Sequence, residues 1–429
     1  MSNVILSSNA NSALCNTLLA SNSLMNPSVY STKTIYPPSS TTYTEHSPSN
    51  GNVPTRSNTT NFQLNKYGIV SQILLTYKKT YTNGTSGALV LGAPQNDFFN
   101  CVEKVELLSS SRVVSTLTKI DFMAQFSNLP YNKMTIIQEN VLKPRDAASA
   151  GAGAETEELT FTVPLVFGFM RDMNTQLNSS FLEPMSIRIT WGKDWNNSKN
   201  FATGVVGNIK SPVLSVRYKN YQEDANSQIL AENFDKPTLN MLSTRFYEEN
   251  RQSILSTSAT ATSESIDIEL KNTECVQDFY VVLVRTAQDG VGASATVASD
   301  ILDPEPQPIS SIEFTGSGQE ILKLNKEQLG YSKIDVDGFS VGQDPTGSNN
   351  KLSNVEKFQT GVYSSAVMSN CISLREINAP KITVKFNIEN PTATPITNLM
   401  RYYAYVVEDC SAIYSITSAT GALSSSLSN

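Results

Sequence analysis

Apolar side chains that recur at every second residue restrict the fold of this chain more than any other feature. Residues 185–191 (MSIRITW) and 382–388 (ITVKFNI) alternate in this way, with polar or charged residues in between. Successive side chains of a β-strand point to opposite faces of the sheet, so a period of two predicts strands with one buried face. Regularly spaced amphipathic helices are absent, which argues against βαβ units. The sequence therefore predicts an all-β protein built from sandwiches.

The strand pattern falls into two blocks, 63–222 and 259–417, joined by a polar connector at 223–258 that carries helix-forming residues around 245–252. A chain of 429 residues is too long for one ordinary sandwich and suits two. The blocks share a pattern of strands and not a direct sequence repeat. We expect a short helix at 120–126 and strands at 67–81, 88–91, 101–108, 159–169, 185–191, 213–221, 266–270, 279–284, 312–314, 321–324, 382–388 and 402–407.

The two ends of the chain have a different composition. Residues 1–62 are rich in Ser, Asn, Thr and Pro, which cannot supply a packed core, although Leu14 and Leu18 are spaced for a short amphipathic helix. We expect a flexible N-terminal arm that becomes ordered on a neighbouring molecule. Deleting residues 1–50 should then leave folded protein and impair assembly. The polar segment 418–429 is expected to be a frayed C-terminal tail.

The chain contains a single histidine, His46, which lies in the expected arm. Serine-histidine-aspartate triads, cysteine-histidine dyads and histidine-ligated zinc sites all need a histidine beside the reacting atoms. We expect His46 to be a solvated residue of the arm, and the sequence therefore argues against all three kinds of site.

Carboxylate pairs are the remaining candidates for catalysis, because a glycoside hydrolase needs one acid and one base or nucleophile. The candidate pairs are Glu155 with Glu157, Asp267 with Glu269, and Asp303 with Glu305. Asp267 and Glu269 alternate with isoleucines and should face solvent, and the other two pairs flank or form loops. Trp195 could stack on a sugar, whereas Trp191 follows the inward alternation of its strand. Residues 335–338 (DVDG) open like a calcium loop but lack its later ligands. The prediction is a protein that is not an enzyme, with no catalytic, cofactor-binding or metal site.

Charge and cysteine content restrict the partners and the compartment. The net charge of −7 and the absence of a basic stripe argue against direct sequence-specific binding of nucleic acid. Five widely spaced cysteines without a CxxC pair indicate free thiols in a reducing compartment. No apolar run has the length of a membrane span, and no Lys or Arg precedes Lys33. We therefore expect synthesis and assembly in a cytoplasm.

Three segments carry a resemblance to a known family. Residues 67–70 (YGIV), 158–165 (ELTFTVPL) and 399–405 (LMRYYAY) resemble barrel strands of the double jelly-roll major capsid proteins, those of tailless icosahedral viruses of the tectivirus–adenovirus lineage, phage-like members included. The layout is also similar over residues 65–416: an arm, two tandem sandwiches, helices only in loops and a Ser-rich end.

The resemblance implies two tandem eight-stranded jelly rolls with short helices in loops. It further implies a homotrimer of pseudo-hexagonal outline that builds an icosahedral virion shell assembled in the host cytoplasm. Its partners would be neighbouring capsomers and penton or minor capsid proteins, and contact of the arm with an internal membrane is left open. The alternative reading is a secreted or surface carbohydrate-binding or adhesin tandem sandwich, with a carboxylate glycosidase as the third possibility.

Overall fold

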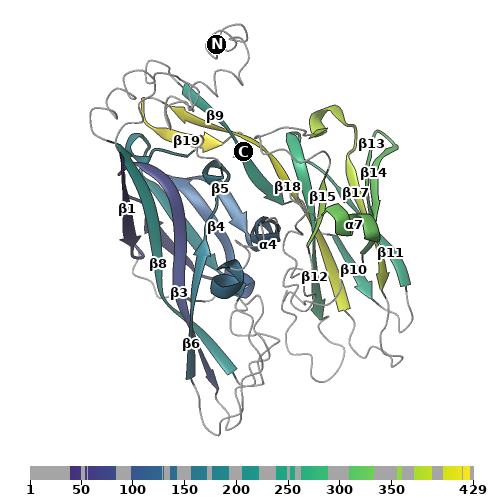
Figure 1. Cartoon of the computed structure of the whole chain (residues 1–429), viewed down its shortest axis with the longest axis horizontal. Helices are drawn as coiled ribbons and strands as arrows, with labels where there is room; N and C mark the ends of the chain where they lie inside the picture. Colours follow the sequence, from purple (N-terminus) through teal and green to yellow (C-terminus); the bar gives the residue numbers. More distant parts are fainter. Residues whose placement is uncertain are drawn as a thin grey trace.

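The computed structural model describes the strands, the short helices and some of the connections between them. The described residues are 39–49, 54–55, 57–83, 98–127, 129, 136–142, 156–171, 176–192, 205–221, 238–248, 252–256, 262–287, 309–332, 355–359, 372–388, 400–417 and 419–425. They form two β-barrels that lie side by side (Figure 1). The prediction of an all-β protein is confirmed.

The first barrel consists of eight strands in two sheets. Sheet 1A has the strand order β1-β8-β3-β6, and sheet 1B has the order β2-β7-β4-β5. The strands are β1 (Ser39–His46), β2 (Thr59–Gln63), β3 (Ile69–Asn83), β4 (Val102–Ser109), β5 (Arg112–Thr118), β6 (Thr156–Pro164), β7 (Met185–Trp191) and β8 (Val205–Tyr221).

The pairing of these strands explains their order. Four antiparallel pairings are nested as in one long hairpin: β1 with β8, β2 with β7, β3 with β6 and β4 with β5. Two further antiparallel pairings, β3 with β8 and β4 with β7, roll that hairpin into two sheets. A rolled hairpin of eight strands in two packed sheets is a jelly roll.

The second barrel repeats this arrangement with eight later strands. Sheet 2A contains the order β10-β18-β12-β15, and sheet 2B has the order β11-β17-β13-β14, which matches sheets 1A and 1B strand for strand. The strands are β10 (Gln252–Ser256), β11 (Thr262–Glu269), β12 (Cys275–Ala287), β13 (Ile309–Gly316), β14 (Gln319–Asn325), β15 (Val355–Gln359), β17 (Lys381–Ile388) and β18 (Met400–Thr417). The two jelly rolls implied by the resemblance are therefore present.

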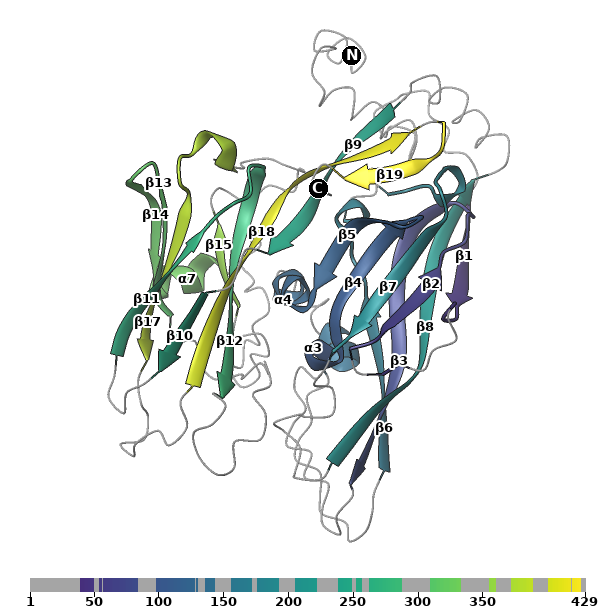
Figure 2. The ribbon, with the colours of Figure 1, turned by 180° about the vertical axis from the view of Figure 1, so that it is seen from behind.

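Three additional strands extend sheet 2A to seven. β16 (Ile372–Ser373) pairs with the start of β12, and β9 (Thr238–Glu248) and β19 (Ala422–Ser425) pair with the second half of β18. That half of β18 leaves the second barrel and passes over the end of the first, where β9 and β19 flank it (Figure 2). β18 thus connects the two barrels, since its first half pairs within the second barrel and its second half places Ala412, Tyr414 and Ile416 in the core of the first.

Helices are short and lie between strands. Their bounds are α3 (Phe98–Cys101), α4 (Lys119–Ser127), α7 (Lys326–Ser332), the π-helical turn η1 (Gln138–Leu142), and the 3-10 turns η2 (Gly168–Met170), η4 (Ser179–Phe181) and η5 (Leu374–Glu376). α4 confirms the predicted helix at 120–126. It follows the fifth strand of the first barrel, and α7 follows the fifth strand of the second.

The observed strands depart from the expected division of the chain in three places. β1 and all but the last residue of β2 lie within the range expected as an arm, β9 and β10 lie within the expected connector, and β19 lies within the expected tail. In each case a polar segment forms backbone hydrogen bonds with a strand distant in sequence, as β1 does with β8. Such pairing outweighs local composition and helix propensity. The helix at 14–18 and the strand at 88–91 lie outside the described residues.

Candidate assembly surfaces

The residues singled out for chemistry are dispersed in the structure. Asp267 and Glu269 are exposed on the outer face of sheet 2B, and Trp191 is buried in the first core, as predicted. Within the described part of the chain, no three or more His, Cys, Asp or Glu side chains are grouped to hold a metal ion. No described helix has the length and apolar character of a membrane span. The other candidates lie outside the described side chains: Glu155, Glu157, Trp195, Asp303, Glu305 and 335–338.

The expectation that His46 is a solvated arm residue is wrong. His46 is the last residue of β1 and is only 8% exposed, with its Nε2 atom 3.4 Å from the Tyr218 hydroxyl. Burial lowers the pKa of His46, and burial also raises the pKa of Tyr218 to about 12. The Tyr218 hydroxyl accepts a hydrogen bond from the Asn65 backbone N–H at 3.1 Å. His46 is thus a neutral packing residue of the first barrel.

An apolar contact joins the two barrels through α4. This helix packs against β12 and β18, and both views place it between the barrels (Figures 1 and 2). Tyr280, Val282, Tyr405 and Val407 line the outer face of sheet 2A and are almost completely buried, in one cluster with the first core. In the strand register, Tyr280 lies opposite Val407 and Val282 lies opposite Tyr405. The outer face of sheet 2A is therefore a second core, shared by the barrels.

Polar contacts reinforce this junction at its margins. Arg171, just after η2 of the first barrel, donates a hydrogen bond of 2.6 Å to Asp409 of β18, whose side chain is 2% exposed. Burial opposes the charge on Arg171, but Asp409 raises the pKa of Arg171 above its usual value. The Thr118 hydroxyl donates to the Glu248 carboxylate at 2.7 Å, and β9 is thereby connected to β5. These two contacts, Arg171 with Asp409 and Thr118 with Glu248, hold the two barrels in one orientation.

The C-terminal hairpin also binds the first barrel. Leu423 of β19 is buried in the first core, and its backbone N–H donates to the Ser109 hydroxyl at 3.2 Å. Gly421 at the turn has φ +72°, and a Cβ there would lie 2.3 Å from the Phe181 carbonyl oxygen. Only glycine fits so close to the neighbouring backbone. The last strand therefore returns to the first barrel, and the expectation of a frayed tail does not hold for residues 419–425.

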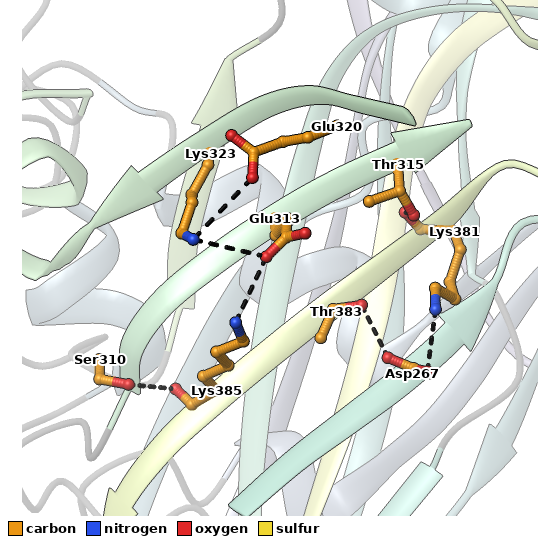
Figure 3. Close-up of polar contacts among 9 residues, drawn as sticks. All are labelled: Asp267, Ser310, Glu313, Thr315, Glu320, Lys323, Lys381, Thr383 and Lys385. Atoms are coloured by element: carbon orange, nitrogen blue, oxygen red, sulfur yellow. Dashed lines mark hydrogen bonds and ion pairs between the residues drawn. The ribbon is translucent and has the colours of Figure 1, made fainter. Parts of the chain in front are cut away.

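The outer face of sheet 2B, the sheet farther from the first barrel, has a different character. Ion pairs cross its four strands: Asp267 with Lys381 at 2.9 Å, and Glu313 with Lys385 at 3.4 Å and with Lys323 at 3.8 Å (Figure 3). Acidic and basic strands thus alternate across the sheet. The Thr383 hydroxyl and the Lys381 ammonium together lower the pKa of Asp267. Because its charges are paired within the sheet, this face is well suited to solvent.

The outer face of sheet 1A is intermediate between these two. Tyr43 of β1 is 63% exposed there, and Lys78 and Lys210 are an exposed cross-strand pair on β3 and β8. Lys78 forms an ion pair of 2.8 Å with Glu158 of β6, with 50% and 43% of the side chains exposed. Thr76 and Val213, one polar and one apolar, lie opposite each other and are partly buried. This face combines an exposed aromatic ring, hydroxyls and an excess of basic groups.

The surfaces at the junction were not predicted from the sequence. The signal for one of them was present, because residues 279–284 (FYVVLV) are apolar at every position and not at every second position. A strand that is apolar on both faces is buried on both faces. The matching run at 402–407 (YYAYVV) carries the same information.

Comparisons with known proteins agree with this architecture. No protein-family model matches the chain, and no curated protein sequence matches it. Among solved structures, PBCV-1 VP54 has a TM-score of 0.64 at 13% identity, with 94% of this chain and 99% of that chain covered. The Faustovirus major capsid protein has a TM-score of 0.59 at 10% identity, covering 96% and 98%. The mavirus major capsid protein has a TM-score of 0.55 at 11% identity, covering 90% of each chain.

These similarities extend over both barrels and the junction between them. Identities of 10–13% are too low to transfer residue roles, so the similarity concerns the fold. The phage-like membership expected from the sequence stays a prediction. The chain has the double jelly-roll fold that these viral capsid proteins share, as the resemblance implied.

Proposed function

We propose that this chain is a major capsid protein that assembles as pseudo-hexagonal homotrimers into an icosahedral virion shell. The observation that carries the proposal is the presence of two jelly rolls of identical strand order, fixed beside each other by a shared core. The similarity in fold to capsid proteins of Faustovirus and mavirus supports it.

The geometry of the junction favours a ring of chains. α4 of one barrel contacts a sheet face of the next, so the two barrels use different surfaces for one contact. Contacts between unlike surfaces generate closed rings when their rotation closes. Three chains with two equivalent barrels each would place six similar units around one axis. Such a block has six near-equivalent sides with which to tile a facet.

The role is structural and not catalytic. Paired surface charges, buried aromatic residues and a histidine inside a barrel all serve packing or solubility in this chain. With a net charge of −7, the shell would contact the genome through other components. The partners are neighbouring capsomers and penton or minor capsid proteins in the virion, which assembles in the host cytoplasm.

Electron microscopy of the purified protein tests this proposal. Negatively stained particles should have a hexagonal outline, and concentrated protein or infected cells should contain shells tiled by them. A chain that stays a single two-lobed particle at all concentrations and binds a defined glycan would overturn the proposal in favour of an adhesin.

The N-terminal segment needs a revised test, because β1 is a strand of sheet 1A. Deleting residues 1–50 removes β1 and should destabilise the first barrel, contrary to the expectation from sequence. Deleting residues 1–38 keeps β1, and should leave trimers while impairing shell assembly. Normal shells from the shorter deletion would show that residues 1–38 are dispensable for assembly.

A further inference from the structure

The two barrels carry equivalent helices at equivalent places. α4 follows β5 and α7 follows β14, the fifth strand of each barrel. Both helices begin with a reciprocal capping box: Thr118 and Asp121 exchange hydrogen bonds at 2.8 and 3.2 Å, and Asn325 and Gln328 do so at 3.0 and 3.1 Å. This shared start aligns the helices residue by residue. The contact made by α4 therefore indicates where α7 could make one.

The surface that receives α4 also has an equivalent. α4 lies on the outer face of sheet 2A, and the strand order makes sheet 1A the counterpart of sheet 2A. Within one chain, α4 covers the face of sheet 2A. The face of sheet 1A is exposed at Tyr43, Lys78 and Lys210 among its described residues. One helix and one sheet face are thus left over, and they are the same two kinds of element as in the contact already made.

The positions of these two surfaces are those a curved assembly needs. α7 and the strands of sheet 1A are both on the side of the molecule that faces the viewer in Figure 1, and both lie behind in Figure 2. When the two contact surfaces of a molecule face the same side, successive copies follow a curve that can close into a ring. Contact surfaces on opposite sides would instead add copies along an open filament.

We propose that the α7 side of the second barrel docks on the outer face of sheet 1A of a second copy of this chain. This inference rests on the proposed function and adds to it the two surfaces that would join the trimer. Each subunit contributes α7 to one neighbour and sheet 1A to the other, so the contact is repeated three times around the ring.

The two contacts differ in polarity, and in each of them the helix has the same character as the sheet face that it meets. α4 carries Ile120 at the position where α7 carries Glu327, and Ile120 is buried whereas Glu327 is exposed. The apolar helix meets an apolar sheet face, and the charged helix would meet a face with Tyr43, Lys78 and Lys210. The contact between copies is therefore more polar than the contact within the chain, with Tyr43 as its aromatic anchor. It should weaken as salt is raised.

Substitutions on the exposed face test this assignment. Tyr43→Ala should raise the trimer dissociation constant about tenfold, since exposed tyrosines at interfaces are frequent anchors. Lys210→Glu should also raise the trimer dissociation constant, and the increase should be larger at low salt than at high salt. Ile321→Ala is the matched control: it removes a large side chain that is 44% exposed on β14 of sheet 2B and should leave the constant unchanged. Thermal unfolding of each variant verifies that the chain is folded.

Lysine labelling of the wild-type trimer gives a readout that needs no variant. Lys78 and Lys210 on sheet 1A should react more slowly in the trimer than in the monomer. Lys381 and Lys385 on β17 of sheet 2B, with side chains 35% and 43% exposed, should react equally in both. Protection of the sheet 2B lysines instead, or a trimer that tolerates both substitutions, would overturn this assignment alone. A wild-type chain that stays monomeric would overturn the proposed function as well.

Discussion

Sheets 1A and 2A have the same strand order, but the outer face of one is exposed and the outer face of the other is buried. The outer face of sheet 2A carries Tyr280, Val282, Tyr405 and Val407, and α4 covers it permanently within the chain. The outer face of sheet 1A carries Tyr43, hydroxyl groups and lysines, and it is open to solvent in the single chain. Identical topology thus supports either a buried or a solvent-exposed outer face. The side chains of one sheet face decide which.

The largest effect is expected where the permanent contact is opened. Tyr280→Ala removes a fully buried aromatic ring from the face of sheet 2A and should lower the free energy of unfolding by about 3–5 kcal/mol. Tyr43→Ala removes the same side chain from the face of sheet 1A and should lower it by less than about 0.5 kcal/mol. Chemical denaturation of both variants measures the difference. Equal losses would contradict the contrast between the two faces.

A slightly smaller effect is expected from the polar margin of the junction. Arg171→Ala leaves the buried Asp409 carboxylate without its cation, which should cost about 3 kcal/mol. Asp409→Asn in the same background should recover part of the loss, because a neutral amide is less costly to bury than an unpaired carboxylate. If Arg171→Ala unfolds like the wild type, the pair does not hold the barrels together.

The single histidine provides a pH test on the inner side of sheet 1A. Burial lowers the pKa of His46, so the folded state binds its proton less readily than the unfolded state, whose pKa is near 6.5. Stability should be full above that value and should fall as the pH is lowered through it towards the pKa of the folded state. In His46→Gln this dependence between pH 7 and 5.5 should disappear. A wild-type chain equally stable over that range would show that His46 is solvated after all.

The smallest effect is expected on the charged face of sheet 2B. Lys381→Ala removes the 2.9 Å ion pair with Asp267, in which both groups are well exposed, and should cost below about 0.5 kcal/mol. Raising the salt concentration should abolish even that difference. A loss of several kcal/mol in thermal or chemical unfolding would indicate that this face supports the fold and not only its solubility.

Much of the fold could be predicted from sequence, and the reason is physical. Half-buried strands such as 185–191 and 382–388 place their own apolar residues in the core. The alternation within each segment is therefore sufficient to predict the strand. β1, β9 and β19 could not be predicted, because their placement depends on backbone hydrogen bonds with β8 and β18. The burial of His46, the last residue of β1, could not be predicted for the same reason.

The candidate surfaces were harder to predict from the sequence than the fold. The apolar run at 279–284 shows that a strand has two buried faces, but it does not say that α4 covers one of them. The exposed face of sheet 1A has no sequence signature, since Tyr43, Lys78 and Lys210 come from three strands far apart in the chain. Only the assembled sheet places them on one surface.

The mass of the native protein in solution tests the central claim most directly. Native mass spectrometry or light scattering of the purified chain should give a species of about 140 kDa, three times the chain mass of 46.8 kDa, which dissociates more readily at high salt. A single species of 46.8 kDa over the whole accessible concentration range would contradict the account of two equivalent barrels built to close a ring of three chains.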